Sequence, residues 1–225
     1  MWRMGGRRIE HELLDESAPE AARPSLADIV RLNKHFGGHA LLKKLLGEFV
    51  KPDSIFKLLD VGAASGDSAS YIRSLYPRAT VVSLDRNAVN ASLAPQPKVL
   101  ADAFRLPFRQ GSFDFVFSSL FLHHFTDEQV TKLLRAFSSL ARQAVLVSDL
   151  ERHLIPYWFL PATAPIFHWN WITQHDGAIS VRAAFTPQEL EKLANRAGLK
   201  KARAKAHRPA FRIGMVAATE ASGLL

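Results

Sequence analysis

Short apolar runs and helix-spaced apolar positions alternate along most of the chain. A continuous apolar run is typical of a strand buried on both faces, so these runs predict β-strands. The expected strands are 56–61, 79–84, 97–101, 113–118 and 143–148, with helices between them at 66–76, 87–93 and 126–141. Strands that alternate with helices form βαβ units, so the pattern predicts an α/β fold with a mostly parallel, doubly wound sheet.

The N-terminal part of the chain differs from this alternating centre. Residues 1–24 are expected to form a capping arm, and Ser25 is expected to cap a first helix. A second helix follows at roughly 39–50. We therefore divide the chain into an N-terminal arm with capping helices (1–52) and an α/β domain (53–225).

The C-terminal part predicts one more helix and two strands. Thr186 has the position of an N-cap, Pro187 follows at the first helical position, and Glu189 is placed for a capping box. The last strands, at about 199–206 and 210–218, are close enough in sequence to pair antiparallel.

The composition excludes some chemistry. The chain has no cysteine, which excludes disulfides, cysteine-bound zinc and a thiol nucleophile. A net charge of +8 would suit a nucleic acid or an anionic membrane. However, the excess lies at Arg3, Arg7, Arg8 and 192–212, without the interleaved aromatic residues of a base-stacking surface, so we interpret it as a solvated face. Because no apolar run follows the charged N-terminus, we expect no secretory signal and a cytoplasmic protein.

The most specific local pattern is the segment 58–67, with the sequence LLDVGAASGD. An apolar strand ends at Asp60, and a loop of small residues then opens a helix. Gly62 and Gly66 have no Cβ, so a ligand can approach the backbone closely. The spacing D-x-G-x-x-x-G differs from the G-x-G-x-x-G of dinucleotide folds and lacks the G-K-[ST] ending of a P-loop. A nucleotide-like ligand is therefore expected at this strand–loop–helix junction.

Three further polar segments come at the ends of the next expected strands. Asp85 ends the second strand, where a carboxylate can accept hydrogen bonds from both hydroxyls of a ribose. Asp102 follows the third strand, and Ser118 ends the fourth. An acid at a strand end also often caps a helix, so each segment alone is a weak signal. Together they lie at the sheet edge where open α/β sheets bind ligands.

In this order and spacing, the four segments resemble the motifs of class I S-adenosylmethionine (SAM) dependent methyltransferases. The likeness is to type 11/12 small-molecule enzymes of the kind found beside polyketide synthases. It implies a Rossmann-like, seven-stranded sheet in the order 3-2-1-4-5-7-6 with the last strand antiparallel, an N-terminal helical cap, and a lid after strand 5 at about 150–185. It also implies SAM as the cofactor, with Asp60 facing the ammonium, Asp85 the ribose and Asp102 the adenine. The implied cofactor-binding residues are Asp60, Gly62, Ala64, Gly66, Asp85, Arg86, Asp102, Ala103 and Ser118.

Four histidines are candidates for a catalytic base. Methyl transfer is an in-line displacement, and histidine is the usual base near neutral pH. His123 and His124 directly follow the fourth motif, and one of the two is expected to point inward. His153 and His175 lie in segments that the resemblance places over the acceptor pocket. Because the paired histidines lack the i, i+4 spacing of metal ligands on a helix, no metal is expected.

An uncharged aromatic segment, 154–172, holds three of the four tryptophans. Its prolines argue against a membrane-spanning helix, so it is expected to pack as core or as an aromatic pocket wall, and only a weak membrane-surface contact stays possible. We interpret it as the pocket wall of a flat or lipophilic acceptor. The candidate substrate-pocket residues are Arg152, Tyr157, Trp158, Trp169 and Trp171.

The sequence therefore predicts a SAM-dependent methyltransferase that acts on a small aromatic or lipophilic acceptor, with a hydroxyl as the expected target. Three alternatives remain. A dehydrogenase would share the acid after the glycines but needs a third glycine that is missing here. An RNA methyltransferase would use the positive charge, and a catalytically inactive SAM-binding protein would keep only the cofactor motifs.

Overall fold

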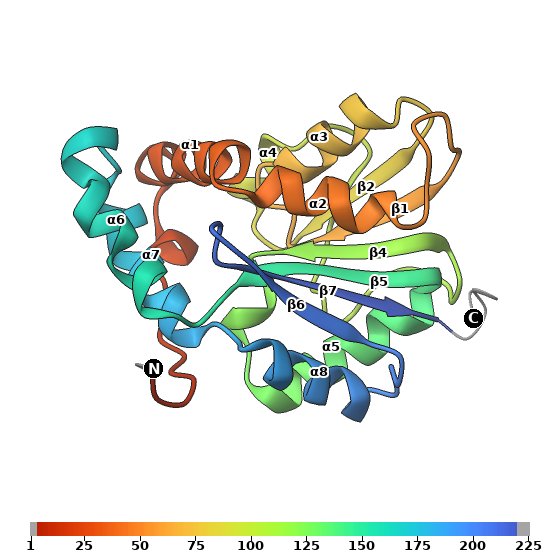
Figure 1. The fold of residues 1–225 in the computed structure, drawn as a ribbon. Helices are drawn as coiled ribbons and strands as arrows, with labels where there is room; N and C mark the ends of the chain where they lie inside the picture. Colours follow the sequence, from red (N-terminus) through yellow and green to blue (C-terminus); the bar gives the residue numbers. More distant parts are fainter. Residues whose placement is uncertain (1–3, 220–225) are drawn as a thin grey trace.

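The computed structural model describes residues 4–219, so Arg3 of the basic N-terminal cluster lies outside the described residues. Within them, seven strands form one sheet in the order β3-β2-β1-β4-β5-β7-β6 (Figure 1). The strands are β1 (Lys57–Val61), β2 (Thr80–Asp85), β3 (Lys98–Leu100), β4 (Phe113–Ser119), β5 (Ala141–Leu150), β6 (Arg203–His207) and β7 (Arg212–Ala218). β7 runs antiparallel to β5 and β6, while β1 to β5 pair in parallel. The expected strand order and the reversed strand are confirmed.

Helices cover both faces of this sheet. α2 (Gly38–Gly47) and α3 (Asp67–Leu75) lie on one face, and α5 (Asp127–Leu140) and α8 (Pro187–Arg196) lie on the other (Figure 1). α8 begins with the expected capping box of Thr186 and Glu189. The short helix α4 (Ala88–Ser92) follows β2.

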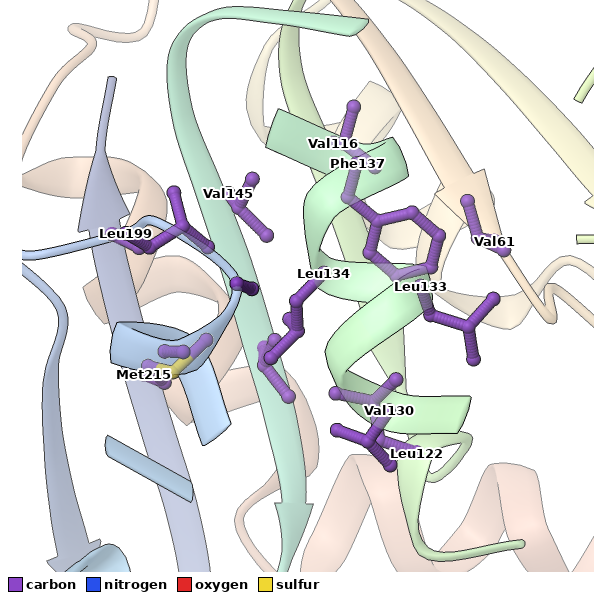
Figure 2. Close-up of a cluster of buried hydrophobic side chains, with 14 of the residues drawn as sticks. Val61, Val116, Leu122, Val130, Leu133, Leu134, Phe137, Val145, Leu199 and Met215 are labelled. Carbon is purple, nitrogen blue, oxygen red and sulfur yellow. The ribbon is translucent and has the colours of Figure 1, made fainter. Parts of the chain in front are cut away.

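Strand β4 shows how a continuous apolar run serves two cores. Phe115 and Phe117 belong to the cluster that contains α2 and α3. Val116 belongs to the opposite cluster, where Phe137 and Leu133 of α5 pack toward the strands (Figure 2). Because successive side chains of a strand point to opposite faces, the centre of a strand between two helical layers is apolar at consecutive positions.

A third group of helices lies together at one end of the sheet (Figure 1). It consists of α1 (Pro19–His35), α6 (Leu154–Phe167) and α7 (Trp171–Ala183). Two short 3-10 helices, η1 (Leu13–Glu16) and η2 (Leu122–His124), contact α7. α1 thus comes from the N-terminal cap, and α6 and α7 from the segment after β5. No helix in the described part of the chain is long and apolar enough to cross a membrane.

The first helix begins earlier than the sequence predicts. α1 starts at Pro19 after Ala18, and Ser25 lies buried inside it instead of capping it. The fixed φ of Pro19 suits the first helical position. Packing on α7 then carries the helix through Pro24, and Ser25 Oγ accepts a hydrogen bond of 3.0 Å from Thr173 Oγ1. The expectation of a cap at Ser25 is therefore wrong.

Gly66, in the loop after β1, is closely packed and has a left-handed backbone conformation. Its φ is +73°, and a Cβ on it would lie 2.5 Å from Pro95 Cδ and 2.9 Å from Ala94 Cα. We expect Gly66→Ala to destabilise the protein beyond the roughly 1–2 kcal/mol that a left-handed conformation costs a residue with a Cβ. Gly198→Ala is the control, because Gly198 has a φ of +95° with no atom within 4 Å of an added Cβ. Urea unfolding measures both, and an equal loss of stability would contradict tight packing at Gly66.

Candidate cofactor and acceptor site

One large cavity lies at the carboxyl ends of the parallel strands, with a volume of about 1390 Å³. β1, β2, β4 and β5 each contribute residues to its floor, and α1, α6, α7 and the N-terminal arm contribute to its walls. Small-molecule pockets occupy roughly 300–1,000 Å³, so this cavity has room for a cofactor together with an acceptor.

The loop between β1 and α3 forms one side of the cavity. Gly62 lines it with a φ of +72°, and a Cβ at this position would collide with the ring of Phe121. The Gly62 and Ala63 N–H groups donate to the carbonyl oxygen of Leu84 at 2.9 and 3.0 Å. The loop is therefore fixed against β2, and a glycine is required at position 62 because the backbone passes beneath an aromatic ring.

Asp60 is a buried acid at the floor of the cavity, 1% exposed. Its Oδ2 has no hydrogen-bond partner among the described residues. Burial, together with the nearby Asp67 and Asp85, raises the pKa of Asp60 to about 8. A cationic ligand group beside this carboxyl would both satisfy its oxygen and favour its ionised form.

Asp85 joins two loops at the end of β2. Its Oδ2 accepts from Ala64 N–H at 2.8 Å, and its Oδ1 accepts from Asn87 N–H at 2.8 Å. Asn87, and not Asp85, caps α4 through its own side chain. A carboxylate offers about four acceptor positions, so Asp85 can still bind hydroxyl groups in the cavity.

Most of the other cofactor candidates also lie at the cavity. Ala64, Arg86, Asp102 and Ala103 line it, and Asp102 Oδ1 accepts from Phe104 N–H at 2.9 Å. Two candidates do not line it. Gly66 packs against Ala94 and Pro95, and Ser118 is buried within β4. Ser119, the next residue of β4, lines the cavity instead.

His123 also lines the cavity and is held between two carboxylates. Its Nδ1 is 2.6 Å from Asp149 Oδ1 in β5, and its Nε2 is 3.5 Å from Glu12 Oε1 in the N-terminal arm. Asp149 is completely buried and also accepts from Leu122 N–H at 3.1 Å. Glu12 accepts a further hydrogen bond from the hydroxyl of Ser180 in α7. His123 is thus oriented by groups from three separate parts of the chain.

The two carboxylates control the charge of His123. Burial alone would lower the pKa of His123, but Asp149 and Glu12 outweigh burial and raise the pKa of His123 to about 10. In turn, His123 outweighs burial at both acids and holds the pKa of Asp149 and of Glu12 below their usual ranges. The imidazole is therefore cationic at neutral pH in this arrangement.

The remaining histidine candidates differ in position. His124 lines the cavity and stacks on His123, with ring centroids 4.3 Å apart. His153 caps α6 by accepting from Ile155 N–H at 3.1 Å and does not line the cavity. His175 is half exposed beside Asp176 within α7 and does not line the cavity either. The structure therefore brings His123 and His124 to the cavity and leaves His153 and His175 outside.

Glu12, His123 and His124 also offer three possible metal-ligand atoms within 4.8 Å of one another. Sequence spacing could not reveal this group, because Glu12 reaches the histidines from the distant N-terminal arm. Ser180 and Asp149 already bind Glu12 and His123, so we interpret the group as an ion-pair network.

The aromatic wall candidates do not line the cavity. Trp158 and Trp171 are exposed, and Trp169 packs against Phe167 with its Nε1 donating to Thr163 Oγ1 at 2.9 Å. Tyr157 lies beside Trp158, and Arg152 binds Glu189 through two hydrogen bonds of 2.8 and 2.6 Å. These side chains point away because 154–167 is helical despite Pro161 and Pro165. The cavity face of that helix is formed by Ile155, Pro156, Phe159 and Leu160.

Sequence reasoning missed the partner residues. Asp149 is not among the candidates from the sequence, although an acid beside a run of apolar strand residues signals a buried hydrogen-bonding role. Arg212, at the start of β7, is a similar signal: it lines the cavity and is 3% exposed.

Comparison with known proteins finds methyltransferases. Residues 59–147 match the methyltransferase domain family. A curated relative, methyltransferase str2 of Strobilurus tenacellus, is 32% identical over 119 residues, which are 50% of this chain and 43% of that protein. The chain thus spans less than half the length of this relative.

Solved structures share the fold. The plantazolicin methyltransferase BpumL in complex with SAH matches with a TM-score of 0.67 at 11% identity, covering 89% of both chains. Human N-acetylserotonin methyltransferase in complex with SAM matches with a TM-score of 0.56 at 19% identity, covering 79% of this chain and 51% of that one. Fold, motifs and domain match together identify residues 59–147 as a class I methyltransferase domain. Both of these solved structures are complexes, one with SAH and the other with SAM.

The raised pKa of His123 predicts how stability depends on pH. A group whose pKa is raised on folding stabilises the protein fully below its unfolded pKa, near 6.5, and this contribution is lost as pH rises toward about 10. We expect the stability advantage of the wild type over His123→Asn to shrink between pH 6.5 and pH 10. Thermal unfolding of both proteins across this range measures it, and a constant difference would show that His123 does not titrate there.

Proposed function

We propose that this chain transfers the methyl group of SAM to a hydroxyl of a small aromatic or lipophilic acceptor. The observation that supports this most is the shared cavity. Its lining includes the motif loop with Asp60 and also His123, which is hydrogen-bonded to the buried Asp149. The apolar face of α6 and Phe36, which follows α1, complete a wall that suits a flat or lipophilic molecule.

The fit to the cofactor rests on the polar groups of the loop. The unpartnered Oδ2 of Asp60 suits the ammonium of the methionine end, and the carboxylate of Asp85 suits the ribose. Asp102 and Arg86 would border the adenine. When bound, SAM supplies an electrophilic methyl group on a sulfonium.

In the proposed reaction, the acceptor oxygen would form a bond to the methyl carbon of SAM as the sulfur–methyl bond breaks and SAH leaves, and His123 Nε2 would take up the hydroxyl proton. Asp149 fixes the ring by binding Nδ1, which directs Nε2 toward the cavity. Glu12 competes for the same nitrogen, because its Oε1 lies 3.5 Å from Nε2. Proton acceptance therefore requires His123 to be neutral, and Glu12 opposes this.

Two alternatives have less support. A nucleic-acid acceptor rests on the net charge of +8 and on no feature of the cavity. A steep salt dependence of RNA binding would favour it. An inactive SAM-binding protein would not need the ordered His123–Asp149 pair beside the motif loop.

Cofactor binding is the first test. We expect SAM to bind in calorimetry, and Asp85→Ala to weaken the affinity about 10- to 100-fold, because hydrogen bonds to a charged group contribute about 1.5–3 kcal/mol each. Asp114→Ala is the matched control, since Asp114 also accepts a backbone N–H, from Lys57 at 2.8 Å, but does not line the cavity. Failure of the wild type to bind SAM, or equal affinities of wild type and Asp85→Ala, would reject the proposal.

The acceptor base is the second test, using turnover of a phenol or quinol found by mass spectrometry with labelled SAM. We expect His123→Ala to lower kcat by about 10²- to 10⁴-fold without changing SAM affinity. Glu12→Gln removes one of the carboxylates that raise the pKa of His123, so the rising limb of the pH–rate profile should move to lower pH.

The controls separate this base from its alternatives. His153→Ala should keep its kcat, because His153 lies outside the cavity. Loss of activity on treatment with EDTA would instead favour a metal ion at Glu12, His123 and His124. Full activity of His123→Ala would remove His123 from the mechanism.

A further inference from the structure

Arg212 is a buried cation with an incomplete set of partners. It is the first residue of β7, pairs in the sheet with Leu150 and lines the cavity. Its Nη2 donates to Asn33 Oδ1 at 3.0 Å. Its Nη1 is buried and has no hydrogen-bond partner among the described residues.

The acids near Arg212 are bound to other groups. Burial lowers the pKa of Arg212 to about 10, and the charges of Asp149 and Asp67 partly oppose this, so the guanidinium remains charged at neutral pH. Asp149 binds His123, while Asp67 Oδ2 binds Asn33 Nδ2 at 3.0 Å and His39 Nε2 at 2.9 Å. A buried charge is costly unless it is paired and hydrogen-bonded. The free donor of Arg212 therefore calls for an anion from outside the chain.

We propose that Arg212 Nη1 binds a carboxylate inside the cavity, and that this carboxylate is the one at the methionine end of SAM. The assignment rests on the proposed function, because it requires SAM in this cavity. A guanidinium suits a carboxylate since its N–H groups match the spacing of two oxygens.

Two observations place this carboxylate at the methionine end. First, Asn33 links Arg212 to Asp67, which opens α3 directly after the motif loop. Second, the cavity contains two buried, unpartnered groups of opposite type, the carboxyl of Asp60 and the guanidinium of Arg212. An α-amino acid end carries an ammonium and a carboxylate together, and these two charges are opposite in sign to the carboxyl of Asp60 and the guanidinium of Arg212.

The test compares ligands that differ only in the carboxylate. Calorimetry gives the affinities of wild type, Arg212→Met and Arg212→Lys for SAM, for SAH and for decarboxylated SAM. We expect Arg212→Met to weaken SAM and SAH about 10- to 100-fold, because a charge-assisted hydrogen bond is lost. Decarboxylated SAM should bind the wild type and Arg212→Met equally, and Arg212→Lys should restore part of the affinity for SAM.

Controls distinguish recognition from a structural role. Arg142→Met removes an arginine that pairs with Asp114 outside the cavity, and it should leave SAM affinity unchanged. Arg212→Met also removes the donor of Asn33 Oδ1, so thermal unfolding without ligand measures its structural cost separately, and affinities are compared at a temperature where both proteins are folded. Equal weakening of SAM and decarboxylated SAM would overturn the proposal.

The carboxylate could also belong to the acceptor, and a second arm separates the two sources. Apparent KM values of a hydroxybenzoate and of the corresponding phenol are compared in wild type and Arg212→Met. A rise in KM confined to the hydroxybenzoate, with unchanged SAM affinity, would show that Arg212 binds a carboxylate of the acceptor. This result would overturn the assignment to SAM. If the wild type binds no SAM, both the proposed function and this assignment are rejected. If the wild type binds SAM and Arg212→Met binds it equally well, only this assignment is rejected.

Discussion

The acceptor side of the site depends on the buried hydrogen bond between His123 and Asp149, 2.6 Å long. Asp149 has no exposed surface, and its carboxylate also accepts the N–H groups of Leu122 and Leu150. These donors compensate for the loss of water around the carboxylate, which would otherwise be costly. The same bonds attach η2 to the end of β5. One carboxylate therefore positions both the imidazole and the turn that carries it.

The N-terminal arm becomes part of the site through the same ring. Glu12 reaches the free edge of His123, and Asp176 of α7 accepts the N–H groups of Leu13 and Leu14 at 2.9 Å each. Arg7 donates to the carbonyl oxygens of His123 and Phe125 at 3.2 and 2.9 Å. The arm thus contacts both α7 and the turn that carries the histidines. It changes the charge of the imidazole as well as closing the cavity wall.

Sequence patterns predict what is local. The strands around Asp60 and Asp85 follow from short apolar runs, and the cofactor loop follows from glycines whose need for a positive φ is a local property. Contacts between distant segments cannot be predicted from a local stretch of sequence. Glu12 and His123, for example, come together only on folding. The wall of the acceptor cavity was missed for a different reason. Ile155 and Phe159 line the cavity at helical spacing. The sequence interpretation instead relied on the tryptophans of the same segment, which do not line the cavity.

Hydrogen-bond satisfaction divides the buried charges of the cavity into two kinds. Asp149 and Asp85 are bound by several donors of the chain, and such groups hold the site in shape. Asp60 Oδ2 and Arg212 Nη1 are buried at the same cavity without a partner. An apolar residue at either position would destabilise the folded protein less, since an unpaired buried polar group is costly. Their presence is explained when a ligand supplies the missing charges, and a zwitterionic end supplies both. The motif loop indicates the methyl donor, and the pattern of unsatisfied groups indicates how that donor is oriented toward His123.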